Sequence, residues 1–299
     1  MHLLEMGNGP LVILCHGFPE LSISWRHQII ALSNAGYRVI APDLRGFGFT
    51  EKPVNKNSYL ISHLINDLLG IVKYANQKEA SLVGQDMGSY LCWYAALMHP
   101  DIFKRVLGIS FHFKPILDDP PSLEFQRIGR NNFFYRNYLM FDELAYTEMD
   151  EHVRTSLISI YRGLTNKEKY LSQSWTKDSF LGLHEISHDY FPDFIGENQF
   201  NFIVSQFKSN SFQAPLMWYQ NFDKNWERLL PYKDKKIEVP ALFIKGDRDP
   251  FYLLENLENL KSFIPGLLSV LTINNCGHFV QQEKPNELNK LMIDFFEKN

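Results

Sequence analysis

Asp86 stands between two glycines in the run 84–88, whose sequence is Gly-Gln-Asp-Met-Gly, after an apolar segment and before a helix-like stretch. Glycines two residues on either side of a central residue permit a sharp strand-to-helix turn and a close approach of the two elements. In enzymes with such a turn the central side chain is exposed and acts as the nucleophile. A carboxylate is already ionised near neutral pH, so Asp86 needs no base to activate it. Attack by Asp86 would form an alkyl ester, which predicts chemistry at a carbon that bears a leaving group.

A nucleophile of this kind works with an acid and a histidine, in the chain order nucleophile, acid, histidine. Asp249 lies in a turn after the apolar run 239–244, and His278 follows another apolar run and a glycine. Asp247 competes with Asp249 for the role of the acid, but the form of the motif favours Asp249. The alternative role of Asp247 is that of a carboxylate that caps the turn. All three side chains would lie at the carboxyl ends of strands, where open α/β sheets place their sites.

An oxyanion hole would complete this set of residues. The apolar run 11–15 leads into a turn at 16–19, and in this architecture one backbone N–H comes from such a loop and another from the residue after the nucleophile. Those residues are Phe18 and Met87, which would stabilise the negative oxygen that forms when water attacks the ester. His16 is a candidate second base, and its alternative is a histidine that braces the loop by hydrogen bonds.

The elements that must position these residues alternate between strands and helices. Strand-like runs rich in Val, Ile and Leu occur near 11–16, 37–42, 80–84, 104–110, 240–246 and 268–273, and a further strand begins by Leu3. Helical patterns fit 60–77, 88–99, 253–263 and 283–297. This alternation predicts an α/β fold with a mostly parallel, doubly wound sheet.

The rhythm changes in the middle of the chain. Residues 115–235 carry many aromatic and amide side chains and few strand-like runs. We therefore expect a helical cap (lid) domain at 115–235, inserted into an α/β core formed by 1–114 and 236–299. Part of the aromatic content of the cap would line an apolar substrate pocket.

These motifs resemble the α/β-hydrolase superfamily and, within it, the epoxide hydrolases that carry a helical cap. The resemblance covers nearly the whole chain. It rests on His16-Gly17-Phe18-Pro19, Pro42-Asp43-Leu44-Arg45-Gly46, Gly84-Gln85-Asp86-Met87-Gly88, Gly246-Asp247-Arg248-Asp249-Pro250 and Cys276-Gly277-His278. It implies the α/β-hydrolase fold and an enzyme that converts a small apolar epoxide and water to a vicinal diol, with no cofactor and no metal. The family usually begins with one more strand, so either the sheet lacks an edge or the chain starts late.

Members of that family use two cap tyrosines whose hydroxyl groups hydrogen-bond the epoxide oxygen. Tyr135 and Tyr219 lie in segments that resemble the family's tyrosine segments, and Tyr138 is the alternative to Tyr135. Two phenols can donate at neutral pH to an oxygen on which charge develops. Phe18 and Trp218 are expected to contact the substrate.

Two rival functions stay open on the same fold. Haloalkane dehalogenases resemble this chain in the run around Asp86, but they stabilise the departing halide with a Trp after the nucleophile and with an Asn or a second Trp nearby. Met87 and Phe18 occupy the two obvious positions here, and neither side chain can donate a hydrogen bond. A catalytically silent ligand receptor should lack part of the nucleophile, base and acid set, whereas this chain keeps all three.

Composition agrees with an α/β enzyme. The chain has 299 residues, of which 45% are hydrophobic, enough for a sizeable core with an insertion. A net charge of −4 gives no general attraction to nucleic acid or to anionic membranes. We see no signal peptide and no apolar stretch of transmembrane length, so no stable membrane insertion is expected. Three cysteines, Cys15, Cys92 and Cys276, suit buried thiols in a reducing cytoplasm. The composition leaves room for a homodimer.

One motif points to a metal and is set aside. Residues 184–188 read His-Glu-Ile-Ser-His, which matches the zinc-protease pattern His-Glu-x-x-His. The extension positions Phe191 and Phe194 cannot supply a third ligand, and no Glu follows about twenty residues later. Two ligands of three make a poor zinc site, so we expect no metal there.

Overall fold

The computed structural model describes residues 1–130, 133–165, 176–183, 191–252, 257 and 259–299. These residues form a seven-stranded sheet with the order β1-β3-β2-β4-β5-β6-β7. β1 pairs antiparallel with β3, and every other neighbouring pair is parallel, which confirms the prediction of a mostly parallel α/β sheet. The strands are β1 (Leu3–Met6), β2 (Leu11–Cys15), β3 (Arg38–Pro42), β4 (Ala80–Gln85), β5 (Phe103–Ile109), β6 (Ala241–Gly246) and β7 (Leu267–Ile273).

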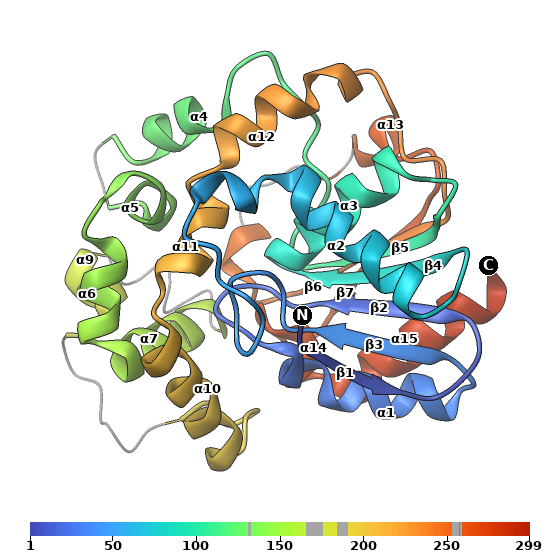
Figure 1. The fold of residues 1–299 in the computed structure, drawn as a ribbon, viewed down its shortest axis with the longest axis horizontal. Helices are drawn as coiled ribbons and strands as arrows, with labels where there is room; N and C mark the ends of the chain where they lie inside the picture. Colours follow the sequence, from blue (N-terminus) through green and yellow to red (C-terminus); the bar gives the residue numbers. More distant parts are fainter. Residues whose placement is uncertain (131–132, 166–175, 184–190, 253–256, 258) are drawn as a thin grey trace.

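Helices cover both faces of this sheet, so its central strands are buried on both sides (Figure 1). Along β2, Val12 and Leu14 join one buried apolar cluster, while Leu11 and Ile13 join the other, because successive side chains of a strand point to opposite faces. α1 and α15 pack together on the first face, and α2 and α3 pack together on the second. The core helices are α1 (Arg26–Asn34), α2 (Ile61–Tyr74), α3 (Met87–Met98), α13 (Leu260–Phe263), α14 (Val280–Glu283) and α15 (Pro285–Lys298).

The predicted helices at 60–77, 88–99 and 283–297 correspond to α2, α3 and α15. Most of the helix predicted at 253–263 lies outside the described residues, which include only its last part as α13. α1 is not among the helices predicted from the sequence. This helix has a mixed pattern and buries a polar residue, Gln28, whose side-chain amide donates to the Gln281 carbonyl at 3.1 Å and to Asn289 Oδ1 at 3.0 Å. Partners from the far end of the chain therefore stabilise α1, and the helix has no apolar stripe from which it could be predicted.

The segment between β5 and β6 folds as helices that lie beside and above the sheet in Figure 1, in green to orange. This confirms the predicted helical insertion. Its helices are α4 (Pro121–Ile128), α5 (Tyr135–Phe141), α6 (Ala145–Glu151), α7 (Val153–Thr165), α9 (Lys177–Leu181), α10 (Glu197–Asn210), α11 (Gln213–Tyr219) and α12 (Phe222–Leu229). Short 3₁₀ turns complete the described structure at Ser22–Trp25, Lys56–Tyr59, Leu230–Tyr232 and Pro250–Tyr252.

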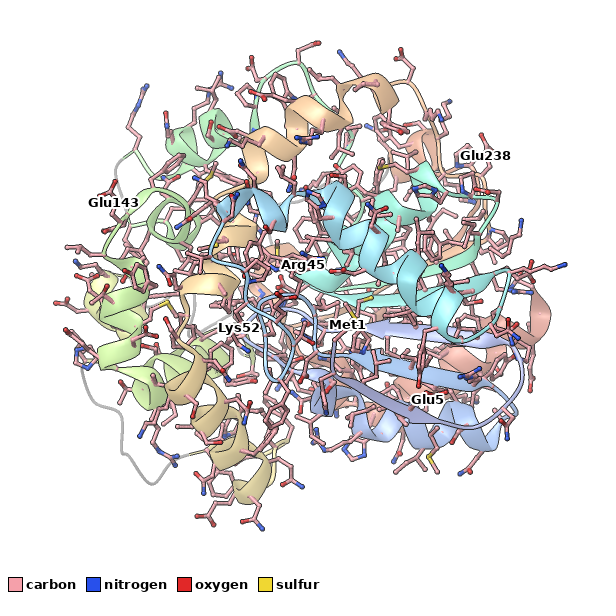
Figure 2. All side chains as sticks on the ribbon, in the orientation of Figure 1. Met1, Glu5, Arg45, Lys52, Glu143 and Glu238 are labelled. Atoms are coloured by element: carbon pink, nitrogen blue, oxygen red, sulfur yellow. The ribbon has the colours of Figure 1, made fainter. Side chains whose placement is uncertain are left out.

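Hydrogen bonds join the cap to the core at several places. The indole N–H of Trp218 donates to the Arg45 carbonyl at 2.9 Å, and the backbone N–H of Ile61 donates to Asn225 Oδ1 at 2.8 Å. Arg45, labelled near the centre of Figure 2, also pairs with Asp67 at 2.6 Å. The bonds of Trp218 and Asn225 hold α11 and α12 against the core.

None of the helices in the described part of the chain is long and apolar enough to cross a membrane.

Candidate active site

The turn between β4 and α3 holds Asp86 in a conformation that L-residues rarely adopt, with φ 50° and ψ −119°. Glycine is required at positions 84 and 88 because neither position has room for a Cβ atom. A Cβ on Gly84 would lie 2.3 Å from the carbonyl oxygen of Gly88, and a Cβ on Gly88 would lie 2.1 Å from that of Cys15. Strand and helix therefore approach as closely as their backbones allow, and the side chain of Asp86 is directed out of the turn towards the cap.

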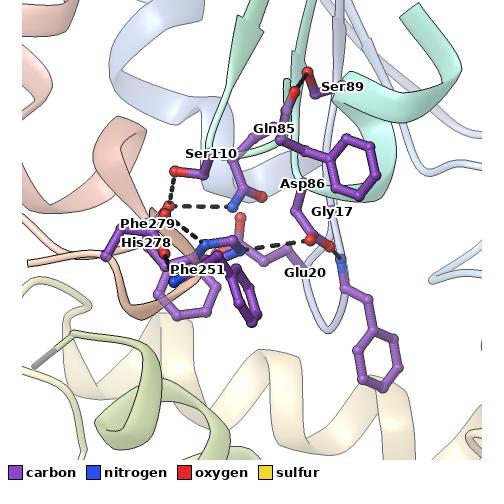
Figure 3. Close-up of polar contacts among 12 residues, drawn as sticks. Gly17, Glu20, Gln85, Asp86, Ser89, Ser110, Phe251, His278 and Phe279 are labelled. Atoms are coloured by element: carbon purple, nitrogen blue, oxygen red, sulfur yellow. Dashed lines mark hydrogen bonds and ion pairs between the residues drawn. The ribbon is translucent and has the colours of Figure 1, made fainter. Parts of the chain in front are cut away.

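His278 lies between Asp86 and Asp249, and Figure 3 shows its contact with Asp86. Its Nδ1 donates to Asp249 Oδ2 at 2.9 Å, and its Nε2 lies 3.6 Å from Asp86 Oδ2, which is longer than a hydrogen bond. Asp249 Oδ1 also accepts from the backbone N–H of Phe251 at 3.0 Å. The competing carboxylate, Asp247, accepts from the backbone N–H of Cys276 at 3.0 Å, so it joins its own turn after β6 to the turn after β7.

These three groups shift each other's pKa. Burial lowers the pKa of His278, but the two carboxylates more than compensate and raise it to about 10. Burial also opposes the charge on Asp86, yet His278 and the backbone N–H groups of Phe18 and Met87 hold the pKa of this carboxyl below its ordinary value. In the resting site Asp86 is therefore an anion and His278 is a cation near neutral pH.

The backbone of His278 is held from both core and cap. Its carbonyl accepts from Ser110 Oγ at 2.7 Å and from Gln85 Nε2 at 3.2 Å, as Figure 3 shows. Its N–H donates to the carbonyl of Leu164, in the cap helix α7, at 3.0 Å. The neighbouring Gly277 has no room for a side chain, since a Cβ there would lie 2.5 Å from the Cα of Thr165. The histidine loop is thus a junction between the two parts of the molecule.

The two residues expected to supply oxyanion donors, Phe18 and Met87, lie beside Asp86. The N–H of Phe18 donates to Asp86 Oδ1 at 3.1 Å, and the N–H of Met87 helps to lower the pKa of the same carboxylate. The side chain of His16 is fully buried, and its Nε2 accepts from the backbone N–H of Leu44 at 3.0 Å. His16 thus braces the loop, which is the alternative that the sequence left open for it.

A pocket lies between the core and the cap. Asp86 stands at its core side, and Tyr135 and Tyr219 line it from α5 and α11. Apolar side chains make up the rest of the wall. The lining residues are Phe18, Asp86, Tyr135, Ile160, Leu164, Phe180, Tyr219 and Phe251. Burial, followed by the charge of Asp86, raises the pKa of Tyr219 well above its ordinary value, so its hydroxyl keeps its proton.

Aromatic contacts hold both tyrosines against the core. The ring of Tyr135 stacks on Phe251 at 5.9 Å, and the ring of Tyr219 meets Phe18 edge-on at 5.5 Å. The alternative residue, Tyr138, instead donates its hydroxyl hydrogen bond to Glu148 Oε2 at 2.7 Å. It is not among the residues that line the pocket.

Trp218 was expected to contact the substrate, and the structure places it elsewhere. Its indole N–H donates to the Arg45 carbonyl, and its ring meets Phe47 edge-on at 6.0 Å. It does not line the pocket described above. Trp218 therefore joins cap to core, while its neighbour Tyr219 points to the pocket, because adjacent residues of a helix face different directions.

Sequence reasoning missed two charged groups beside the site. Glu20 is fully buried, accepts hydrogen bonds from the side chains of Gln281 and Gln282, and has a pKa that burial raises to about 7. Arg136 follows Tyr135 directly, and its Nε donates to the Tyr135 hydroxyl oxygen at 2.9 Å. No sequence motif identifies either residue. Glu20 contacts its partners only because the fold brings them together, and Arg136 contacts Tyr135 only because its side chain adopts a particular rotamer.

The remaining sequence candidates concern thiols and metals. Cys15, Cys92 and Cys276 are all free and buried. The motif at 184–188 lies outside the described residues. Within the residues that the structure describes, no group of three or more His, Cys, Asp or Glu side chains is arranged to hold a metal ion.

Comparison with known proteins identifies the family. A family model described as alpha/beta hydrolase fold matches residues 10–285. Epoxide hydrolase 3 of Siraitia grosvenorii is 33% identical over 308 residues, which cover 100% of this chain and 95% of that protein. Epoxide hydrolase A of Mycobacterium tuberculosis (strain ATCC 25618 / H37Rv) is 33% identical over 304 residues, covering 99% of this chain and 93% of that protein.

Solved structures give the same result. The crystal structure of epoxide hydrolase A from Mycobacterium thermoresistibile matches with a TM-score of 0.92 and 34% identity, covering 99% of this chain and 94% of that one. An epoxide hydrolase from an endophytic Streptomyces matches with a TM-score of 0.93 and 32% identity, covering 99% and 91%. The resemblance seen in the motifs is confirmed over the full length, and the chain belongs to the epoxide hydrolases of the α/β-hydrolase fold.

Proposed function

We propose that this enzyme converts an apolar epoxide and water to a vicinal diol through a covalent ester on Asp86. One observation carries most of the proposal: an ionised carboxylate on the β4–α3 turn lines the same pocket as two tyrosines from the cap. A nucleophile and two proton donors on opposite walls suit a substrate that must be attacked at carbon and protonated at oxygen.

In the first step, an oxygen of Asp86 attacks one epoxide carbon from the side opposite the C–O bond, and that bond breaks. The epoxide oxygen takes the hydroxyl proton of Tyr135 or Tyr219, so an ester and a tyrosinate result. Hydrogen bonds from both hydroxyl groups stabilise the negative charge as it develops on that oxygen.

Once Asp86 is esterified, His278 releases its Nε2 proton to the solvent, and it regains one when Asp86 is an anion again. In the second step, the neutral His278 takes a proton from water, and the resulting hydroxide attacks the carbonyl carbon of the Asp86 ester. The N–H groups of Phe18 and Met87 hold the oxyanion that forms. The ester bond then breaks, and the leaving alkoxide takes its proton from His278. The other hydrogen of the water returns the tyrosinate to its neutral form, which closes the balance for the addition of one water molecule.

The electrostatics of the site favour this order of events. Two carboxylates raise the pKa of His278 to about 10 in the resting site. The ring is then already protonated and has no free nitrogen lone pair with which to act as a base. Ester formation removes the charge of Asp86, and one of these two influences disappears. The pKa of His278 falls after the first step, when a base is needed, while Asp249 still orients the ring through Nδ1.

The lining of the pocket supports an apolar substrate. Ile160, Leu164, Phe180, Phe251 and Phe18 surround the three polar groups. Neither side chain at the positions that would hold a halide, Met87 and Phe18, can donate a hydrogen bond. An epoxide suits this pocket better than a haloalkane does, because its leaving oxygen meets the two tyrosines.

A panel of matched substrates tests the proposal. Purified enzyme is assayed with styrene, aliphatic and fatty-acid epoxides for diol, and with haloalkanes of the same carbon skeletons for released halide. We expect diol from the epoxides and little halide. Halide release that exceeds diol formation would favour a dehalogenase, and the absence of both products would favour a ligand receptor.

A further inference from the structure

A cationic group contacts one of the two tyrosines and not the other. Arg136, in the first turn of α5, donates from Nε to the hydroxyl oxygen of Tyr135 at 2.9 Å. Among the described residues, no guanidinium or ammonium N–H is hydrogen-bonded to the hydroxyl of Tyr219. The two proton donors of the pocket therefore stand in different electrostatic surroundings.

Aromatic rings surround the guanidinium of Arg136. Its central carbon lies 5.4 Å from the ring centroid of Phe251, 5.5 Å from that of Phe125 and 5.9 Å from that of Phe111. The side chain is largely buried, and in the described part of the chain no carboxylate forms an ion pair with it. Burial lowers the pKa of Arg136, but Tyr135 and, more weakly, Tyr219 and Asp86 raise it overall, so the charge is retained.

This hydrogen bond has a direction. A guanidinium can only donate, whereas a phenol has one hydrogen and can accept as well. The bond from Arg136 uses a lone pair of the Tyr135 oxygen and does not use the hydroxyl hydrogen. That hydrogen can still be given to an oxygen in the pocket that Tyr135 lines together with Asp86.

The bond also has an energetic consequence during the reaction. When the Tyr135 proton moves to the epoxide oxygen, negative charge appears on the phenol oxygen. A cationic N–H already in place at 2.9 Å stabilises that charge, and screening is weak because the surroundings are apolar rings. The same contact stabilises the tyrosinate until the second step reprotonates it.

From this geometry we propose that Arg136 is a positioning residue that makes Tyr135 the stronger of the two proton donors in epoxide opening. The inference rests on the proposed function. It assigns unequal roles to the two tyrosines: Tyr135 gives the proton, and Tyr219 mainly holds the oxygen by a hydrogen bond.

The test measures the two steps separately by rapid mixing, with alkylation and ester hydrolysis followed in single turnovers on a neutral epoxide. Arg136→Met removes the charge and the donor. We expect alkylation to slow by roughly 10-fold or more, less than the 10²–10³ typical of a direct donor to a developing charge because Arg136 acts through Tyr135, while ester hydrolysis and the thermal midpoint change little. Arg136→Lys, which keeps a charged donor, should recover most of the loss.

A mutant cycle separates this role from simple packing. In a Tyr135→Phe background, Arg136→Met should change alkylation by less than about 2-fold, because the bond on which it acts is gone. In a Tyr219→Phe background, the loss should be at least as large as in wild type. Arg154→Met is the matched control, since Arg154 is another cap arginine with a ring contact, 5.1 Å from Phe200, and a hydrogen bond to a neutral oxygen, that of Asn201.

The outcomes are distinguishable. An equal loss in the Tyr135→Phe and wild-type backgrounds, or no loss at all, would overturn the assignment of Arg136 while leaving epoxide hydrolysis intact. A loss confined to epoxides that carry a carboxylate would make Arg136 a contact for the substrate anion instead. Should Arg136→Met fail to fold, Arg136→Gln carries the same cycle. Wild-type enzyme that opens no epoxide would refute the proposed function itself.

Discussion

The two walls of the pocket are built in different ways. On the core side, Asp86, Asp249 and His278 stand on turns at the carboxyl ends of parallel strands. At the turn of Asp86, a side chain on Gly84 or Gly88 would collide with neighbouring backbone atoms. On the cap side, Tyr135 and Tyr219 lie at the ends of helices of only seven residues each, and aromatic side chains hold them in place.

This difference separates the chemical roles. Covalent catalysis needs a nucleophile and a base held to a fraction of an ångström, and a sheet with paired strands supplies that rigidity. Proton donors that serve substrates of different shapes need a pocket wall that can change shape while it keeps its two hydroxyl groups in place. Short helices that pack through aromatic rings supply such a wall. We therefore expect changes on the core side to abolish turnover and changes on the cap side to reduce it by degrees.

The largest effect is expected at the nucleophile. Asp86→Ala removes the atom that forms the first covalent bond, so turnover should fall by at least about 10⁴-fold. The thermal midpoint should stay near that of wild type, because the side chain points into the pocket. Diol formation near the wild-type rate in this variant would show that Asp86 is not the nucleophile. It would also refute the proposed contrast between the core side and the cap side of the pocket.

The base should give the next largest effect and a distinct product. His278→Gln leaves alkylation possible but removes the base for hydrolysis, so the enzyme should stop as the ester. Intact-protein mass spectrometry after addition of substrate should show one added substrate mass. His112→Gln, which changes another buried histidine, is the control and should turn over without trapping. An unmodified mass in His278→Gln, with substrate binding retained, would contradict this division of labour.

The cap side should respond in a graded way. Loss of one hydrogen bond to a developing charge typically costs on the order of 10²–10³ in rate. Because the two hydroxyl groups are partly redundant, each single Phe variant should be milder than this, and Tyr135→Phe with Tyr219→Phe should be severe. Alkylation should slow while ester hydrolysis does not. Tyr138→Phe, one turn further along α5, is the matched control, and full-speed epoxide opening by the double variant would refute the cap's role.

The dependence on pH sharpens the core side. The pKa of His278, raised to about 10 in the resting site, should be lower in the ester, where Asp86 is neutral. Hydrolysis requires the neutral ring, so its rate should rise about tenfold per pH unit below the pKa of the ester form and then level off. Single-turnover rates of ester hydrolysis measured from about pH 6 to pH 10 would reveal this rise and the plateau that follows it. A rate that falls as the pH rises through this range would show that the histidine acts in its charged form.

The smallest effect is expected where cap meets core away from the pocket. Trp218→Phe removes one hydrogen bond, to the Arg45 carbonyl, and should cost about 1 kcal/mol in the free energy of unfolding. Alkylation and hydrolysis should stay within about 2-fold of wild type, since the indole does not line the pocket. A large and selective rise in KM would instead support the expectation from sequence that Trp218 contacts the substrate.

The core of the site could be predicted from local patterns. The run 84–88, the two apolar runs before Asp249 and His278, and their order along the chain carry the information, because a glycine-bounded turn after a strand allows few backbone paths. Choosing Asp249 over Asp247 rested on the form of the motif, and the structure has Asp249 at His278 Nδ1 and Asp247 on a backbone N–H. The tyrosines could be located only through the family resemblance, since the cap has no comparable local pattern.

The sequence by itself determined the class of fold, the helical insertion after β5, and the grouping of Asp86 with Asp249 and His278, because strand periodicity and glycine requirements are local properties of the chain. Only the tertiary structure decided which polar groups meet across long separations. Gln28 in α1 bonds the backbone of Gln281, and the N–H of His278 bonds Leu164 of the cap. The link from Arg136 to Tyr135 joins neighbours in sequence, yet only packing among rings selects the rotamer that makes it. Such contacts depend on how elements that are distant in sequence pack against one another, and no short stretch of sequence encodes that packing.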